Sequence, residues 1–342
     1  MFKHQIKSVI PPVQYLILGN RMFLLSMVLL VISAYFYDAN EAFIAVEVGI
    51  IQFLYNLKFS NGKSTIKGSL EPLLMTLIAV PLSLASMPFA PITTSLFVFV
   101  LVLIERDNHH QGVPKYILPL SFLLLSMMMI PSDIENTALM IQRSASVVLG
   151  VTAAIIASIL IWPNNTTKED KKTGQPKRKI NTTDLKYSSR KGLGIGLILS
   201  LEFFGWMGAA LGAYLLMMIH SPVSKNLAHK AWERLSGTVI GALFYLPVGV
   251  LLNYIASPEI QVVLMWSLVI LSLYMILIYL EYNYTVASAS IMFLILTIGV
   301  GPFNLEIVEL VFMPRLWYTL IGGGVMVALG LIIPLRDKDM QA

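Results

Sequence analysis

Twelve apolar stretches run through the chain, and they constrain its fold more than any other feature. Lipid offers backbone groups no hydrogen-bond partner, so only helices and closed barrels cross it. The stretches lack the period-2 alternation of barrel strands. Only 13% of the residues are charged, about half the usual share in a soluble domain. We therefore expect an all-α membrane protein with about 12 transmembrane helices. The stretches lie near residues 22–37, 41–57, 69–87, 92–105, 115–130, 137–162, 192–205, 206–220, 232–255, 260–280, 284–300 and 312–334.

The distribution of charge predicts how these helices are oriented. With the N-terminus in the cytoplasm and twelve spans, every basic residue except Arg143 and Arg315 falls on the cytoplasmic side. An excess of lysine and arginine marks the cytoplasmic loops of membrane proteins. This pattern predicts a multi-pass protein of the bacterial inner membrane with both termini in the cytoplasm. One helix over 192–220, instead of two, would place the C-terminus outside, which the same rule disfavours.

The two halves of the chain repeat one another. LEPLLMTLIAV at 70–80 resembles WERLSGTVIGA at 232–242, and QRSASVVLG at 142–150 resembles PRLWYTLIG at 314–322. Because each half has six expected spans, both enter the membrane from the same side. Such a parallel repeat has its axis along the membrane normal, and a transport pathway between the halves would follow that axis.

The repeat predicts the domain organisation. We expect a first six-helix repeat over 1–163 and a second over 192–342. Residues 164–191 form the longest polar stretch and predict a flexible cytoplasmic linker.

Three motifs of the second half resemble the fusaric acid resistance protein (FUSC) family, which includes inner-membrane aromatic acid exporters. They are WERLSGTVIGA at 232–242, NYTVASASIMFLILT at 283–297 and PRLWYTLIGG at 314–323. The resemblance is strongest over 190–334 and weaker over 63–163. It implies twelve spans and proton-driven export of aromatic or other small organic acids. It also implies a periplasmic membrane-fusion adaptor protein as a partner.

The same resemblance suggests residues and an alternative. Asn283, Tyr284 and Thr297 match the family pattern and are candidates for binding the substrate, or else bridge helices. Plant malate channels resemble the same six-helix unit. A passive organic-anion channel is therefore the alternative to an exporter.

Arg143 and Arg315 occupy matching positions in the two halves, one or two turns inside the expected outer ends of their helices. An arginine in the middle of a membrane helix costs about 2.5–3.5 kcal/mol on insertion scales. Two arginines beside a shared axis would bind a substrate carboxylate. The alternative is that they reach the outer headgroups or pair with nearby acids.

Glu47 and Glu202 are the acids that lie well inside apolar stretches. Burial raises the pKa of a carboxyl, so such a group takes up and releases protons near neutral pH. We expect them to be proton-coupling residues of a transporter, or neutral carboxyls hydrogen-bonded to a neighbouring helix.

Glu71 and Glu233 begin the third and ninth expected helices, where a carboxylate complements the helix dipole. Arg234 follows Glu233, whereas proline follows Glu71. A structural role is favoured for these residues, with gating as the alternative. Gly237 and Gly241 have the GxxxG spacing that lets membrane helices approach closely.

Several chemistries find no support in the sequence. The chain has no cysteine, which excludes thiolate metal sites and cysteine nucleophiles. It has no GxxxxGK[ST] loop for ATP, and His109 and His110 lack further metal ligands nearby. The basic residues border apolar stretches, which argues against nucleic-acid binding. We therefore expect no enzyme activity and no cofactor, and a membrane scaffold is the remaining non-transport alternative.

Overall fold

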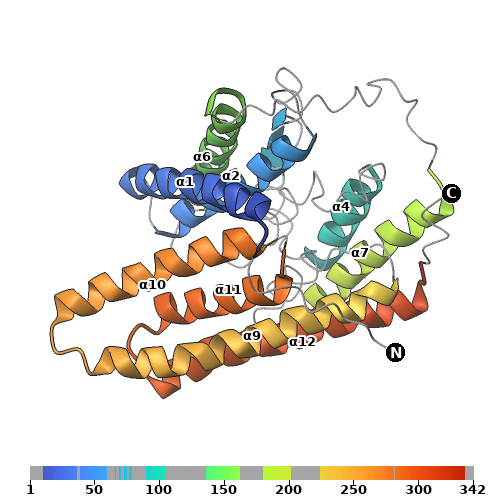
Figure 1. Cartoon of the computed structure of the whole chain (residues 1–342). Coiled ribbons are helices and arrows are strands. Elements are labelled where there is room, and N and C mark those ends of the chain that lie inside the picture. The colour runs from blue at the N-terminus through green and yellow to red at the C-terminus, as the bar shows by residue number, and fades with distance from the viewer. Residues whose placement is uncertain are drawn as a thin grey trace. The chain divides into compact units, whose positions relative to one another are not determined.

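The protein is helical throughout the described part of the chain. The computed structural model describes residues 11–36, 39–59, 90–104, 136–161, 180–201, 224–280 and 282–335, with isolated positions between 66 and 78. No strand occurs among them, so the expected all-α class is confirmed there (Figure 1). The helices are α1 (Val13–Phe36), α2 (Ala39–Phe59), α4 (Ala90–Ile104), α6 (Asn136–Ile156) followed by a π-helical turn (Ala157–Ile161), α7 (Thr182–Ser200), α9 (Ser224–Asn253), α10 (Pro258–Tyr279), α11 (Tyr284–Gly299) and α12 (Leu305–Ile332).

Five helices of the described chain are long and apolar enough to cross a membrane. Their apolar spans are Val13–Ser33, Ile141–Ile161, Asn226–Asn253, Pro258–Tyr279 and Leu305–Ile332. Shorter apolar helices cover Ile44–Leu57, Pro91–Ile104 and Tyr284–Gly299. These lengths and compositions indicate a multi-pass membrane protein. Stretches 115–130 and 206–220, and most of 69–87, lie outside the described residues, so a total of twelve stays a prediction.

Some helices begin earlier than their apolar stretches. Helices α9 and α12 each start about two turns before the expected residues 232 and 312. The added turns carry polar residues, which a hydropathy pattern does not detect. As a consequence, Arg315 lies about three turns inside α12, deeper than expected.

Helix α7 also begins early, within the expected linker 164–191. Asn181 caps it: the Asp184 backbone NH donates to Asn181 Oδ1 at 2.8 Å, and the Asn181 NH donates to Asp184 Oδ2 at 3.0 Å. This reciprocal capping box satisfies two backbone donors that the first turn would otherwise leave unpaired. Residues 182–191 are therefore helix and not flexible linker.

The chain divides into two compact units. Unit 1 consists of Met1–Leu24 and Ala228–Leu320, and unit 2 of Leu25–Leu227 and Ile321–Ala342. These units differ from the expected halves because the start of α1 packs with helices of the second half, and α7 packs with α4 of the first half.

In unit 1, α9 and α11 run parallel and very close. A β-carbon on Gly237 would collide with Ser288, and one on Gly241 with the Ala289 carbonyl. The two contacts advance in the same direction along both helices, which fixes their parallel course. The GxxxG prediction for this pair is thus confirmed: small residues let the two backbones approach.

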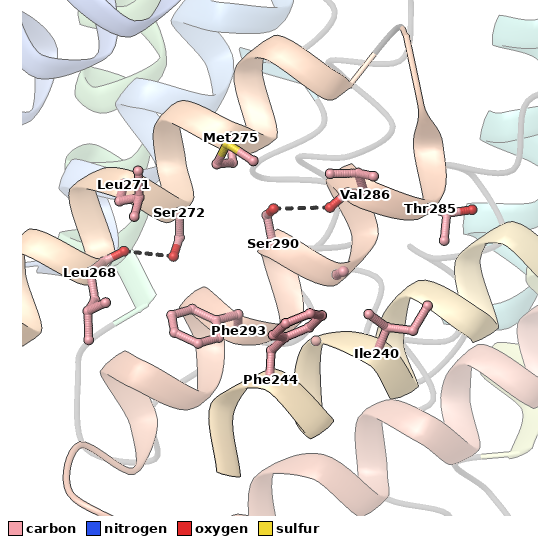
Figure 2. A pocket seen from close by; sticks show the side chains of 12 residues that line it. Ile240, Phe244, Leu268, Leu271, Ser272, Met275, Thr285, Val286, Ser290 and Phe293 are labelled. Atoms are coloured by element: carbon pink, nitrogen blue, oxygen red, sulfur yellow. Dashed lines mark hydrogen bonds between the residues drawn. The ribbon is translucent and has the colours of Figure 1, made fainter. Parts of the chain in front are cut away.

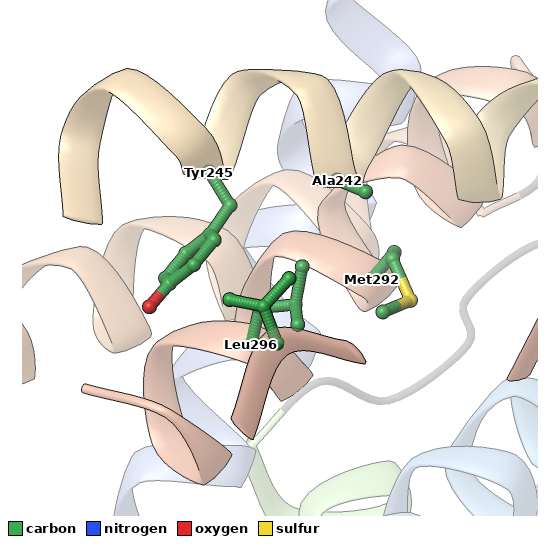
Figure 3. Packing of buried hydrophobic residues seen from close by; sticks show 5 residues of the cluster. Ala242, Tyr245, Met292 and Leu296 are labelled. Carbon is green, nitrogen blue, oxygen red and sulfur yellow. The ribbon is translucent and has the colours of Figure 1, made fainter. Parts of the chain in front are cut away.

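On the C-terminal side of Gly241, α9 packs on α11 through a buried cluster drawn in Figure 3. Its members are Ala242, Tyr245, Met292, Leu296 and Val308. The Tyr245 hydroxyl donates to the Gly301 carbonyl at 2.7 Å, so this buried polar group is satisfied as membrane burial requires.

The start of α1 completes unit 1 by packing on α10. Gly19 lies against Ile278, and the Tyr274 hydroxyl donates to Asn20 Oδ1 at 2.8 Å. The Phe23 and Tyr274 rings meet edge to face, with centroids 5.2 Å apart. Helix α10 is thereby held between α1 and α11.

Unit 2 contains two close helix pairs. Helices α2 and α6 pack through Ile44, Val48, Val147 and Val151. Helices α4 and α7 meet where Gly192 faces Ser95, whose hydroxyl donates to the Gly192 carbonyl at 2.9 Å.

Candidate functional site

The residues expected to bind substrate from the two halves belong to different units. Arg143 is buried on α6 in unit 2, whereas Arg315 is partly buried on α12 in unit 1. Glu47 is partly buried on α2. Glu71 and Glu202 lie outside the described residues. The expectation that Arg143 and Arg315 flank one pathway therefore stays a prediction.

Four other candidate residues come together in unit 1. Glu233 and Arg234 lie in the third turn of α9, and Asn283 and Tyr284 begin α11. Asn283 caps α11 by accepting a hydrogen bond from the Val286 backbone NH at 3.3 Å. It therefore stabilises the start of α11, where the Tyr284 ring lies near Lys230 and Arg234 of α9. Sequence reasoning had selected these residues separately, for gating and for substrate binding.

Arg234 is the centre of this cluster. Its side chain is buried, and Nη1 donates to Ser288 Oγ at 3.3 Å. The guanidinium carbon lies 5.8 Å from the centroid of the Tyr284 ring, within cation–π range. Within the described chain, Arg234 Nε has no hydrogen-bond partner, and neither has the Tyr284 hydroxyl. A buried guanidinium with one long neutral hydrogen bond is under-satisfied, because buried charges are ordinarily paired.

The neighbouring carboxylate is engaged elsewhere. Glu233 lies within ion-pair distance of Lys230, Nζ to Oε2 at 3.2 Å, and of His229, Nε2 to Oε1 at 3.3 Å, although Glu233 Oε2 accepts no hydrogen bond within the described chain. Lys230 also lies 5.4 Å from the Tyr284 ring centroid. Two cations thus share one aromatic ring while the nearest acid serves Lys230 and His229. The cluster of Lys230, Arg234 and Tyr284, called here the cationic cluster, is suited to receive an anion.

A cavity of about 370 Å³ starts one residue beyond this cluster. It lies between α9, α10 and α11 and runs from Thr285 to Phe293 along α11, as Figure 2 shows. Ligand sites commonly have volumes of about 300–1,000 Å³. Its lining residues are Ile240, Gly241, Phe244, Leu268, Leu271, Ser272, Met275, Thr285, Val286, Ala289, Ser290 and Phe293.

Two polar side chains in the walls of this cavity donate their hydroxyl protons within the protein. The Ser272 hydroxyl donates to the Leu268 carbonyl at 2.7 Å, and the Ser290 hydroxyl to the Val286 carbonyl at 3.0 Å (Figure 2). Both bonds stay within their own helix. Thr297, expected to bind substrate, likewise donates to the Phe293 carbonyl at 2.8 Å and does not line the cavity.

Two polar features of unit 2 were not found from the sequence. The first is a buried network in which Gln52 and Ser69 both bond to Asn56 Oδ1, at 2.9 and 3.1 Å, and Asn56 donates to Ser158 at 3.3 Å. Ser158 lies in the π-helical turn. The hydrogen bonds within the network are of the kind that holds membrane helices together.

The second feature is the basic pair Arg190 and Lys191, which is buried on α7. Burial, and then the charge of Arg190, lower the pKa of Lys191 to about 7. Arg190 lies 5.5 Å from the Tyr187 ring centroid. The buried positions 184, 187, 188, 191, 195 and 198 recur at helical spacing. Several of these residues are polar, so a hydropathy pattern does not reveal this buried face.

Comparisons with known proteins identify no family for this chain. No protein-family model, no curated protein and no solved structure matches it.

Proposed function

We propose that the protein is a secondary exporter of small organic anions, aromatic acids among them, across the bacterial inner membrane. The observation that carries the proposal is the buried, under-satisfied guanidinium of Arg234 beside an apolar cavity. A carboxylate would complete the hydrogen bonds of Arg234, and the cavity would receive an apolar body. This combination of one charged anchor and an apolar pocket is typical of small-molecule sites.

The proposal includes twelve spans in two parallel six-helix repeats. Helix packing supports it. Helix α1 packs on α10 in unit 1, and α7 packs on α4 in unit 2. In a six-helix repeat, the first and seventh spans are equivalent, as are the fourth and tenth. The same pair of positions therefore packs together in both units, each time with one helix from either half.

Proton coupling is assigned to Glu47 and Glu202, and a periplasmic membrane-fusion adaptor is the proposed partner. Glu47 is partly buried on α2, within the apolar stretch Ile44–Leu57. The resemblance to the fusaric acid resistance protein family supports the proton drive and the adaptor, whereas Glu47 and Glu202 are chosen as acids inside apolar stretches.

Export is tested by measuring the efflux of aromatic and aliphatic carboxylates from cells that express the chain. We expect Arg234→Gln to lower efflux at least about tenfold, because a hydrogen bond to a charged group contributes about 1.5–3 kcal/mol. Lys225→Gln, at the start of α9, is the matched control and should keep efflux. A protonophore and Glu47→Gln should both stop it.

Other results would point elsewhere. Flux that follows only the substrate gradient, ignores the protonophore and Glu47→Gln, and falls with Arg234→Gln indicates a passive anion channel. If no carboxylate leaves faster with the protein present, the transport proposal is wrong.

A further inference from the structure

The cavity between α9, α10 and α11 has an exposed apolar rim. Phe244 is 66% exposed and Leu271 56% exposed at its rim. Leu271 lies near the middle of α10, and both α9 and α10 contain candidate membrane spans. At this depth, an exposed apolar rim suits a ligand that arrives from hydrocarbon.

The polar side chains of the lining are Ser272, Thr285 and Ser290, so the interior offers a ligand few hydrogen bonds. The Ser272 and Ser290 hydroxyls donate hydrogen bonds to carbonyls of their own helices. The remaining lining is mostly aliphatic or aromatic, with Phe244 and Phe293 on one wall (Figure 2). A hydroxyl group on the body of a ligand would exchange its water for few hydrogen bonds, and a buried polar group without a partner costs about 1–3 kcal/mol by protein mutational data.

Charge is present toward one end of the cavity. Thr285 and Val286 line that end and directly follow Tyr284 of the cationic cluster. Because α9 and α11 run parallel, Arg234 lies at the level of this end, bonded to Ser288. At the other end, Phe293 lies against the Tyr245 ring. The cationic cluster thus lies near one end of the cavity, and the other end is apolar.

From this polarity we infer that the cavity binds an amphiphilic monocarboxylate with an unsubstituted hydrocarbon body, which enters from the bilayer. The carboxylate meets Arg234 and Lys230, and the hydrocarbon fills the cavity between Ile240 and Phe293. The inference rests on the proposed organic-anion export and narrows its substrate class to lipophilic acids. Acids with hydroxylated bodies are poor ligands of this site.

The test uses the full chain in lipid nanodiscs and two photoreactive probes. One is a ten-carbon carboxylic acid with a diazirine near its far end, and the other is the matching alcohol. After illumination, mass spectrometry locates the labelled residues. We expect the acid to label residues 240–244, 268–275 and 285–293, and the alcohol to label them at least about tenfold less, as loss of a charge-assisted bond predicts. A hydroxylated aromatic acid should not compete.

Matched variants separate the cavity from its surroundings. Ser290→Leu and Ser272→Leu, on opposite walls, fill the space and should abolish labelling. Ser290→Ala removes only a hydroxyl that is satisfied within its own helix and should keep it. Arg234→Gln should reduce acid labelling to the level of the alcohol.

Four results would overturn the inference: equal labelling by acid and alcohol, labelling that survives both leucine variants, displacement of the probe by ordinary phospholipid, or cross-links between two copies through α9 and α10. The last two would mean that a lipid chain or a second copy occupies the cavity.

Failure of the exporter proposal gives different results from failure of the cavity inference. Efflux of a carboxylate that is unchanged in Ser290→Leu supports export and overturns the cavity as its site. Selective labelling without efflux keeps the site and refutes export.

Discussion

At the scale of single residues, buried charge is what sets this protein apart from an ordinary helical bundle. Within the described chain, Arg234 keeps an unused donor near an apolar cavity, whereas Lys191 is buried on α7 next to the charge of Arg190. A buried charge is costly unless it is compensated. Arg234 therefore bears on ligand binding, whereas Lys191 bears on how the stability of the fold depends on pH.

From the burial of Lys191 we predict that the free energy of unfolding increases with pH. Its pKa is about 7 in the folded protein, against about 10.4 when unfolded. Between these values the unfolded chain binds a proton that the folded chain does not, so the free energy of unfolding rises by up to about 1.4 kcal/mol per pH unit. Below pH 7 both states are protonated and this contribution is constant.

The measurement is the melting temperature of the detergent-solubilised chain from pH 6 to pH 10. We expect it to rise above pH 7 in the wild type and to be flatter in Lys191→Met, which should also be more stable at pH 6. Lys186→Met, on an exposed position of the same helix, is the control. Identical slopes in wild type and Lys191→Met would refute the assignment.

At the scale of elements, the site depends on how closely α9 approaches α11. Gly237 and Gly241 remove the side chains that would separate these helices. Their contact brings Arg234 alongside Ser288 and Tyr284, and it sets the width of the cavity whose wall includes Gly241. The site therefore forms only where these two helices pack closely.

Gly241→Ala should destabilise the protein, because its β-carbon collides with the Ala289 carbonyl. Overpacking of this kind costs about 1–3 kcal/mol. Gly324→Ala on α12 is the matched control, since a β-carbon there meets nothing within 4 Å. Thermal unfolding in detergent measures both. Equal melting temperatures for the two variants would mean that α9 and α11 are not in backbone contact.

At the scale of the whole molecule, the division into units does not follow the division into sequence halves. Unit 1 takes the start of α1 from the first half, and unit 2 holds α7 from the second. An exchange of helices between repeats accounts for both assignments if the chain contains two parallel six-helix repeats. The orientation of the spans is the part of this organisation that is most directly measurable.

The absence of cysteine allows a clean test of orientation, because any introduced cysteine is unique. Asn226 and Ala256 are exposed near opposite ends of α9. We expect a membrane-impermeant maleimide to label Ala256→Cys in intact cells, and Asn226→Cys only after the inner membrane is permeabilised. Labelling of both from the same side would contradict a spanning α9, and the reverse pattern would contradict the predicted cytoplasmic termini.

The sequence by itself determined the class of the protein and the approximate positions of its helices. Long apolar stretches are sufficient for that, because lipid leaves the backbone hardly any alternative to helix. It also pointed to Glu233 and Arg234, as charged residues at the start of an expected helix, and to Asn283 and Tyr284, through the resemblance to the FUSC family. Local pattern misplaced the start of α7, where a capping box and a partly polar buried face carry the helix.

Only the tertiary structure decided that Arg234 meets Tyr284 and Ser288, and that a cavity follows. The bond from Arg234 to Ser288 joins positions 54 apart on α9 and α11, and the cavity is lined by three helices. They depend on the distance and direction of helix crossing, which hydropathy does not encode because lipid-facing and core-facing residues of a membrane helix are both mostly apolar. The physical reason is that lipid sets where a helix can exist, whereas side-chain packing sets which helices touch.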